Sequence, residues 1–197
     1  MGKSQVLQIK DHKVKVITMD ISVDIFKHNK INYDWRTLYV GLKMDVIKIN
    51  DITNYAVEFL ANHHEINNPS IIQLAWGGED IDYECLLENI LNDSNNKELN
   101  LDSDVWEIEK RKWRFGILAY LNIKHQDDYE ELLNKIAEVY ADFNYPEDMD
   151  SFINYLTPQD NTNPSLYSKE ENITRLINLF YDFLNKEHRC LQNDNIF

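Results

Sequence analysis

Apolar side chains recur every three or four positions along most of the chain beyond residue 32, and this period predicts amphipathic helices. The most regular stripe consists of Tyr129, Leu132, Leu133, Ile136, Tyr140 and Phe143. Equivalent stripes lie within residues 34–42, 50–60, 69–76, 83–91, 106–120 and 168–184, and a short one lies within 146–156. We therefore predict a mainly α protein of about seven helices, whose short connections favour one antiparallel layered array.

Residues that commonly begin or end helices flank several of these stripes. Asp34 precedes one stripe as an N-cap, because a carboxylate can accept hydrogen bonds from the free N–H groups of the first turn. Pro69 suits a first helical turn, and Gly77 follows the last apolar residue of the same stripe. Ser168 and Glu171 have the spacing of a capping box, so the last helix should begin there.

The segment before residue 32 has a different pattern. Apolar and polar residues alternate strictly over 17–25, which predicts a half-buried strand, and Val14 and Val16 could belong to a pairing strand. The alternative is a short helix over 23–28 that Ser22 caps. The sequence leaves both interpretations open.

Domain organisation follows from the connections. The polar stretch 92–101 is the best candidate for a flexible break, but it is too short for a typical interdomain linker. We therefore predict one helical domain over 1–197, in which 1–30 form an N-terminal arm or a short β segment.

Charge narrows the classes of partner. The net charge is −14, but residues 1–50 carry +4 and residues 51–197 carry −18. Such a field disfavours binding to nucleic acid and favours encounter with a basic protein. No apolar run has the length of a membrane span, and Cys85 and Cys190 lack metal-ligand spacing. We expect a cytoplasmic protein with free thiols and no membrane partner.

Most motifs that carry catalysis or bind phosphate do not occur in the chain. His63 and His64 form its one histidine pair, but adjacent helical residues point about 100° apart and do not converge on a metal. The basic residues of 110–114 lie near two acids, Glu107 and Glu109, which predicts a solvated, ion-paired helix face. We therefore predict no catalytic residue, no metal and no cofactor.

Two acidic strings remain as candidate sites. Residues 79–84 precede a helix, where negative charge is stabilising, and they lack the glycine and closing glutamate of a calcium loop. Residues 145–149 combine a tyrosine, a proline and two acids at another helix start. Helix capping is the simpler interpretation of both strings, and binding of a protein partner is the functional one. The candidate partner-binding residues are Glu79, Asp80, Asp82, Tyr145, Glu147 and Asp148.

Several short segments resemble one bacterial family. They are the residues 34–41 (DWRTLYVG), 112–114 (KWR), 140–149 (YADFNYPEDM) and 152–155 (FINY). Together they are similar to the family catalogued as domain of unknown function 2247, over roughly residues 20–156. The resemblance implies a small helical bacterial protein and brings no established activity or catalytic residue.

Three functional hypotheses are compatible with these observations. The first is a non-catalytic binding protein of immunity or antitoxin type, whose acidic face covers a basic site on a toxin. The second is an enzyme that uses carboxylates, in which Glu79, Asp80, Asp82, Glu147 and Asp148 would have to converge in one acidic cleft. The third is a regulatory scaffold module that binds through exposed tryptophans.

Overall fold

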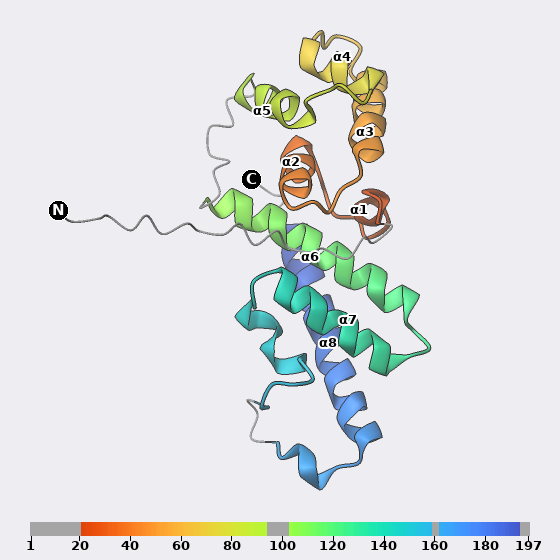
Figure 1. The fold of residues 1–197 in the computed structure, drawn as a ribbon, viewed down its shortest axis with the longest axis vertical. Helices are drawn as coiled ribbons and strands as arrows, with labels where there is room; N and C mark the ends of the chain where they lie inside the picture. Colours follow the sequence, from red (N-terminus) through yellow and green to blue (C-terminus); the bar gives the residue numbers. More distant parts are fainter. Residues whose placement is uncertain (1–20, 94–102, 159–161, 194–197) are drawn as a thin grey trace, which may run out of the picture.

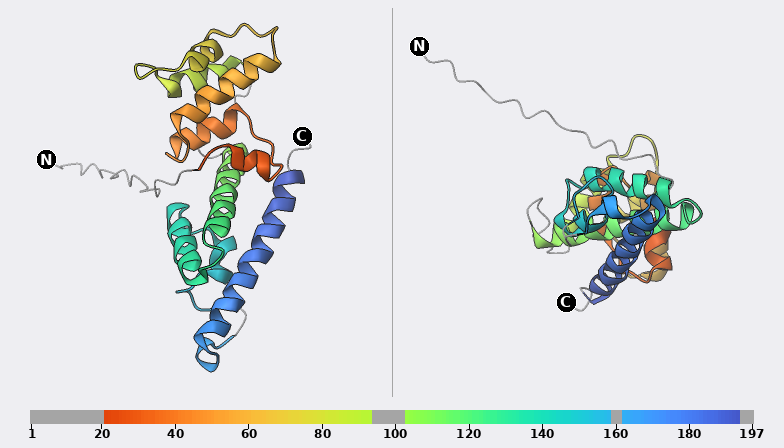
Figure 2. Two further views of the ribbon diagram at one scale, coloured as in Figure 1. Left: turned by 90° about the vertical axis from the view of Figure 1, so that its right-hand side faces the viewer. Right: turned by 90° about the horizontal axis from the view of Figure 1, so that it is seen from below.

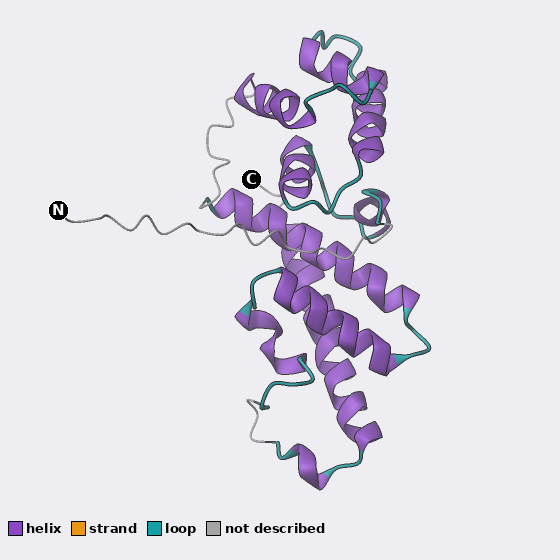
Figure 3. Ribbon diagram, viewed as in Figure 1, coloured by secondary structure: helices purple, strands orange, loops and turns teal. Residues whose placement is uncertain are grey.

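The computed structural model describes residues 21–93, 103–158 and 162–193, and every regular element within these ranges is a helix (Figures 1 and 3). The elements are α1 (Asp24–His28), α2 (Trp35–Lys43), α3 (Ile49–Asn62), α4 (Pro69–Trp76), α5 (Tyr83–Asp93), α6 (Asp104–Lys124), α7 (Tyr129–Asp142), the 3₁₀ helices η1 (Glu147–Phe152) and η2 (Pro164–Leu166), and α8 (Lys169–Asn193). The mainly helical fold class is thereby confirmed. None of the described helices is both long and apolar enough to cross a membrane.

Helix α6 runs through the middle of an elongated molecule (Figures 1 and 2). Helices α1 and α2 pack against it from the N-terminal half (residues 21–93), and α7 and α8 pack against it from the C-terminal half (residues 126–193). The buried apolar side chains of both halves form one cluster. Near the end of α8, Nε2 of His188 donates to the carbonyl of Asn29 at 2.6 Å, so the last helix also contacts the segment that follows α1.

The strand predicted near the N-terminus is wrong over its described part. Residues 24 and 25 belong to helix α1, and the Ser22 hydroxyl accepts a hydrogen bond from the Asp24 N–H at 3.3 Å. Phe26 is fully buried and meets Trp113 of α6 edge-on, with ring centroids 5.0 Å apart. Packing on α6 therefore favours a helix here. The short-helix alternative is confirmed over Asp24–His28, but Val23, and not Ser22, is its N-cap residue. Residues 17–20 lie outside the described part of the chain.

The predicted helix boundaries are mostly confirmed by their caps. The Asp34 carboxylate accepts from the N–H groups of Arg36 and Thr37, and the Thr37 hydroxyl accepts from the Asp34 N–H. Ser168 and Glu171 exchange the two hydrogen bonds of a capping box, at 3.1 and 2.7 Å. These side chains satisfy N–H groups that a helix start otherwise leaves without a partner.

Three helices end on a residue other than glycine in the left-handed conformation. Lys30 after α1, Asp45 after α2 and Asn144 after α7 have φ between 54° and 63°. In each case two N–H groups close back onto carbonyls of the last turn, which is the Schellman arrangement. Glycine usually occupies this position, but the chain has only five glycines, and these three residues end the helices in its place. The short helix predicted after Pro146 also exists, but as the 3₁₀ helix η1.

Helices α2 and α6 cross at unusually close range at Gly41. A Cβ placed on Gly41 would lie 2.4 Å from the ring of Trp113, which is fully buried. The same indole donates from Nε1 to the carbonyl of Thr37 at 2.8 Å. Only glycine leaves room for this contact, so the position of α2 on α6 depends on the absence of a side chain at residue 41.

A buried ion pair lies beside this crossing. Glu109 is 2% exposed and accepts from the Thr37 hydroxyl at 2.6 Å and from Nζ of Lys112 at 2.9 Å. The predicted solvated face is therefore wrong for Lys112, which is 5% exposed because α2 covers this side of α6. It holds for Lys110, which pairs with Glu107 at 3.6 Å near the surface.

We expect Gly41→Ala to destabilise the fold by about 2 kcal/mol or more, because the buried indole has no space into which it can shift. Urea denaturation followed by circular dichroism measures this difference. Asn54→Ala is the matched control, since Asn54 is exposed within α3 and alanine there should be neutral or slightly stabilising. Equal stability of Gly41→Ala and the unmodified protein would contradict the close crossing.

Candidate functional site

The candidate residues chosen from the sequence fall into two separate groups. Glu79, Asp80 and Asp82 lie in the turn between α4 and α5, at one end of the molecule, whereas Tyr145 precedes η1 and Glu147 and Asp148 begin it, in the other half (Figure 1). The structure does not bring the two acidic strings together. The single acidic cleft that a carboxylate enzyme would need is therefore not formed by these residues.

The turn between α4 and α5 is held by its own hydrogen bonds. Asp82 accepts from the Cys85 N–H at 3.0 Å, which confirms the capping interpretation for this residue. The Tyr83 hydroxyl accepts from the Gly78 N–H at 3.2 Å and thereby fixes the turn. Glu79 and Asp80 remain exposed. They follow Trp76, whose side chain is 82% exposed and which the sequence pattern had placed only as the last residue of a helix.

The other tryptophans do not form the exposed patch that the scaffold hypothesis requires. Trp35, Trp106 and Trp113 are buried and belong to the core. Trp76 is therefore the one exposed member of the four tryptophans in the sequence.

Tyr145 has an unusual backbone conformation. Its φ is 57°, directly after the left-handed Asn144 that closes α7, and it precedes Pro146. The left-handed conformation costs a non-glycine residue roughly 1–2 kcal/mol, and a residue before proline is normally extended. The Tyr145 side chain is nevertheless 59% exposed, and its ring meets that of Tyr140 edge-on at 5.3 Å.

A second exposed tyrosine completes this surface. Tyr155 is 59% exposed, and its ring centroid lies 6.5 Å from that of Tyr140. The Tyr140 hydroxyl donates to the Asp150 carboxylate at 2.6 Å. We call Tyr140, Tyr145, Asp150 and Tyr155 the tyrosine surface. Of these residues only Tyr145 was a predicted site residue, although three tyrosines within sixteen positions are a signal that could have identified the others.

Hydrogen bonding changes the ionisation of Tyr140. The carboxylate of Asp150, which accepts the phenolic proton, raises the pKa of Tyr140 to about 12, and loss of solvent contact adds to the effect. The pKa of Tyr155 is also raised, chiefly by loss of solvent around its hydroxyl. Both phenols therefore act as neutral hydrogen-bonding groups at physiological pH.

Asp148 is half exposed, but its carboxylate is paired with a buried arginine. Its two carboxylate oxygens accept from the guanidinium of Arg114 at 2.9 and 2.5 Å, and Arg114 is only 5% exposed. Arg114 also lies 3.5 Å from Glu187 of α8, a carboxylate that Arg111 binds through two hydrogen bonds. The prediction of a solvated face is therefore wrong for Arg114 as well. These pairs fix η1 and α8 on α6.

The region around the tyrosine surface is strongly acidic. Residues 127–171 include twelve acidic and two basic residues. Glu147 is exposed directly beside Tyr145 and takes part in no ion pair that the structure shows. This stretch of the chain, which includes the exposed tyrosines, therefore carries a net negative charge, and such a charge complements a positively charged partner.

Metal ligation has no geometric basis among the described residues. No group of three or more His, Cys, Asp or Glu side chains in that part of the chain is placed to hold an ion. The His63 ring stacks on Phe59 with centroids 4.3 Å apart and donates from Nδ1 to the Phe59 carbonyl at 2.9 Å. These contacts place His63 at the end of α3 as a structural residue.

Comparison with known proteins identifies one family. A family model described as an uncharacterized protein conserved in bacteria, DUF2247, matches residues 23–188. The match extends from the start of α1 nearly to the end of α8 and includes both acidic strings. It confirms the family resemblance that segments such as 34–41 and 140–149 carry. No curated protein and no solved structure matches the chain.

The bond between Tyr140 and Asp150 predicts a pH effect. In the unfolded chain a tyrosine loses its proton near pH 10, whereas folded Tyr140 keeps it to about pH 12. Above pH 10 the folded state therefore binds more protons, and its stability should fall as pH rises through this window. A pH titration that follows phenolate absorbance measures this effect. The Tyr140→Phe variant should lose one phenol, the one whose pKa is about 12 in the unmodified protein. Loss of a group that titrates near 10 would contradict the bond.

Proposed function

Because the chain belongs to the bacterial DUF2247 family, whose description gives no activity, we propose its function from the surface itself: a non-catalytic protein that binds a basic segment of another protein. The tyrosine surface makes the contact, and the acids around it attract the partner. Two observations support the proposal, the strained exposed tyrosine and the charge of residues 127–171.

The conformation of Tyr145 carries the proposal. Asn144 already closes α7, so the helix end does not require a second left-handed residue. The strain at Tyr145 instead holds a large side chain outside the core, where it remains 59% exposed. Strained residues persist mainly where function retains them, and tyrosines are among the residues that contribute most to protein interfaces. Tyr140 supports the exposed ring edge-on, so the contact surface is formed before a partner binds.

Electrostatics sets the class of partner. Rim charges on such a surface mainly speed association and select oppositely charged partners. With twelve acidic and two basic residues over 127–171, this surface suits a segment rich in lysine or arginine. The attraction is screened by salt, since the Debye length is about 10 Å at 0.1 M.

The more specific immunity or antitoxin type remains a prediction from the sequence. It requires a toxin with a basic functional site, encoded beside this protein, that the acidic end of the molecule covers. Binding of that neighbour through the tyrosine surface would identify the partner within the proposed class.

One observation favours the regulatory scaffold as a second candidate. Trp76 is 82% exposed near two exposed acids, Glu79 and Asp80, and it ends α4, whereas the tyrosine surface belongs to α7 and the segments after it in the other half of the molecule (Figure 1). A protein with exposed aromatic residues in both halves could hold two partners at once. This function would need Trp76 in addition to Tyr145.

A comparison of matched variants tests the proposal. The purified protein, immobilised as bait, is exposed to lysate of its bacterial host, and retained proteins are quantified for the unmodified chain, for the double variant Tyr145→Ala with Tyr155→Ala, and for Trp76→Ala. We expect a basic protein whose retention falls about tenfold in the tyrosine variant and is unchanged in Trp76→Ala. Retention should also weaken when salt is raised from about 50 to 300 mM.

A folding control and two possible results decide whether the proposal fails. Each variant should fold, because the removed side chains are exposed, and circular dichroism checks this. Retention that depends on Trp76 and not on the tyrosines would place the binding surface at the other end. A retained partner that is indifferent to salt would contradict the electrostatic part of the proposal.

A further inference from the structure

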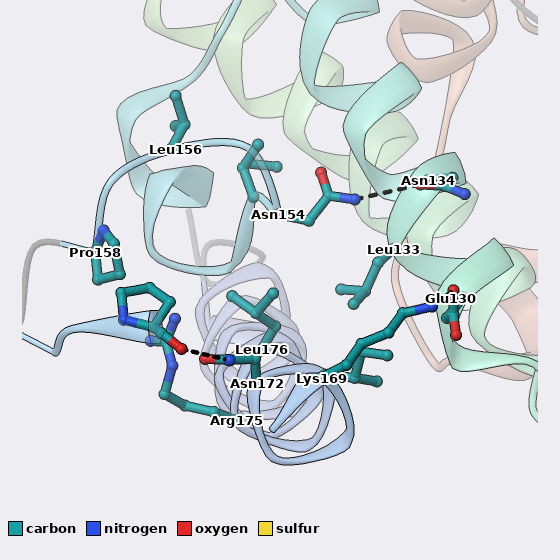
Figure 4. A pocket seen from close by; sticks show the side chains of 13 residues that line it. Glu130, Leu133, Asn134, Asn154, Leu156, Pro158, Lys169, Asn172, Arg175 and Leu176 are labelled. Carbon is teal, nitrogen blue, oxygen red and sulfur yellow. Dashed lines mark hydrogen bonds and ion pairs between the residues drawn. The ribbon is translucent and has the colours of Figure 1, made fainter. Parts of the chain in front are cut away.

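A pocket of about 330 Å³ lies between α7, α8 and the segments around η1 and η2 (Figure 4). Its volume is within the range of pockets that bind small ligands or single side chains. The buried side chains of Leu133, Ile153 and Leu176 form part of its lining. Further apolar lining comes from Leu156, Pro158, Pro164 and Ile173.

A hydrogen-bond acceptor inside the lining has no partner. Asn172 donates from Nδ2 to the Pro164 carbonyl at 2.9 Å and to the Ser168 carbonyl at 3.0 Å, which fixes its orientation (Figure 4). Its Oδ1 is buried and accepts no hydrogen bond in the described chain. Buried polar atoms are nearly always bonded, and protein atoms cover this one in the free chain, so a ligand N–H or O–H would complete it after a small movement of the lining.

Two further amides lie at the opening. Asn154 donates from Nδ2 to Oδ1 of Asn134 at 3.2 Å, and both side chains are exposed. Among the described residues, this bond leaves the Nδ2 group of Asn134 as a donor and Oδ1 of Asn154 as an acceptor. A peptide group presents the complementary acceptor and donor.

The charged residues of the lining do not favour a free anion. Nζ of Lys169 lies 2.5 Å from the Glu130 carboxylate, so its charge is already compensated, and Arg175, the other basic residue of the lining, also has a partner within the protein. The surrounding residues 127–171 are predominantly acidic. A carboxylate or phosphate ligand would have to enter against this field.

We propose that the pocket binds one aliphatic side chain of an extended peptide segment whose neighbouring residues are basic. The apolar lining receives the side chain, the three asparagines bond the adjacent peptide groups, and the surrounding acids pair with the basic neighbours. Tyr155 of the tyrosine surface lies in the chain between Asn154 and Leu156, which both line the pocket, so one partner segment can cover both features. The inference rests on the proposed function and specifies the chemistry of the partner.

Synthetic peptides test the pocket without knowledge of the natural partner. The full-length protein, labelled with ¹⁵N, is titrated with acetyl-Lys-Leu-Lys-amide and with acetyl-Lys-Ser-Lys-amide, which has the same charge and no aliphatic side chain. We expect the leucine peptide to shift the side-chain amide resonances of Asn134, Asn154 and Asn172, with at least about tenfold tighter binding than the serine peptide. 3-Methylbutan-1-ol, which mimics the leucine side chain without peptide groups, should bind weakly.

A pair of substitutions on one helix locates the response. Asn134 and Glu138 are both exposed on α7, but only Asn134 lines the pocket. Asn134→Trp should abolish the shifts at Asn154 and Asn172, because the indole covers the opening, and Glu138→Trp should leave them unchanged. Both positions are exposed, so both variants should fold.

Other outcomes would overturn the inference. Equal binding of the leucine and serine peptides would reduce the effect to surface charge. Equal binding of the alcohol would assign the pocket to small apolar molecules, and shifts that depend on protein concentration without peptide would assign it to a second copy of the chain. Any of these results leaves the proposed function intact if the tyrosine-dependent partner is still retained. Loss of that partner while the leucine peptide binds would overturn the proposed function instead.

Discussion

The close crossing of α2 over α6 is the constraint on which the rest of the structure depends. Gly41 lets the indole of Trp113 lie directly against the α2 backbone, where Nε1 bonds the Thr37 carbonyl. The Thr37 hydroxyl in turn bonds Glu109, whose other oxygen pairs with Lys112. Polar groups that would be costly to bury alone satisfy one another here. Because α7 and α8 pack on the same helix, this crossing also sets how the two halves are joined.

A second set of ion pairs connects the core to the backbone that carries the tyrosine surface. Arg114 of α6 holds Asp148 at the start of η1 and lies 3.5 Å from Glu187 of α8. Burying such pairs contributes little net stability, because desolvation offsets much of the attraction, but removing one partner leaves an uncompensated charge. The pairs therefore act mainly to fix one arrangement. The backbone between α7 and η1, which carries Tyr145, is held at both ends: by the closed helix end and by Asp148.

The helices can be predicted from the sequence better than the contacts between them or the residues that gather on the surface. Helices such as α4 and α7 follow from apolar period and caps, and Asp34, Pro69 and Ser168 begin helices as their chemistry requires. The alternation that predicted a strand at the N-terminus is too short to outweigh the packing of Phe26 on α6. The burial of Lys112 and Arg114 could not be predicted, because it depends on contacts between distant parts of the chain. Thr37 of α2 bonds Glu109, the partner of Lys112, and Glu187 of α8 lies 3.5 Å from Arg114. Tyr145 was found from its local string, whereas Tyr155 and Asp150 become neighbours of Tyr140 only in the folded chain.

Hydrogen exchange of the free protein tests most directly whether the binding surface is formed before a partner arrives. The Tyr145 N–H bonds the Tyr140 carbonyl at 2.8 Å, and the Met149 N–H bonds the Pro146 carbonyl at 2.9 Å. If the anchorage through Asp148 and α6 holds this backbone in place, these two amides should exchange nearly as slowly as those in the middle of α7. Exchange at the rate of an unstructured peptide, with α7 still protected, would contradict a preformed tyrosine surface.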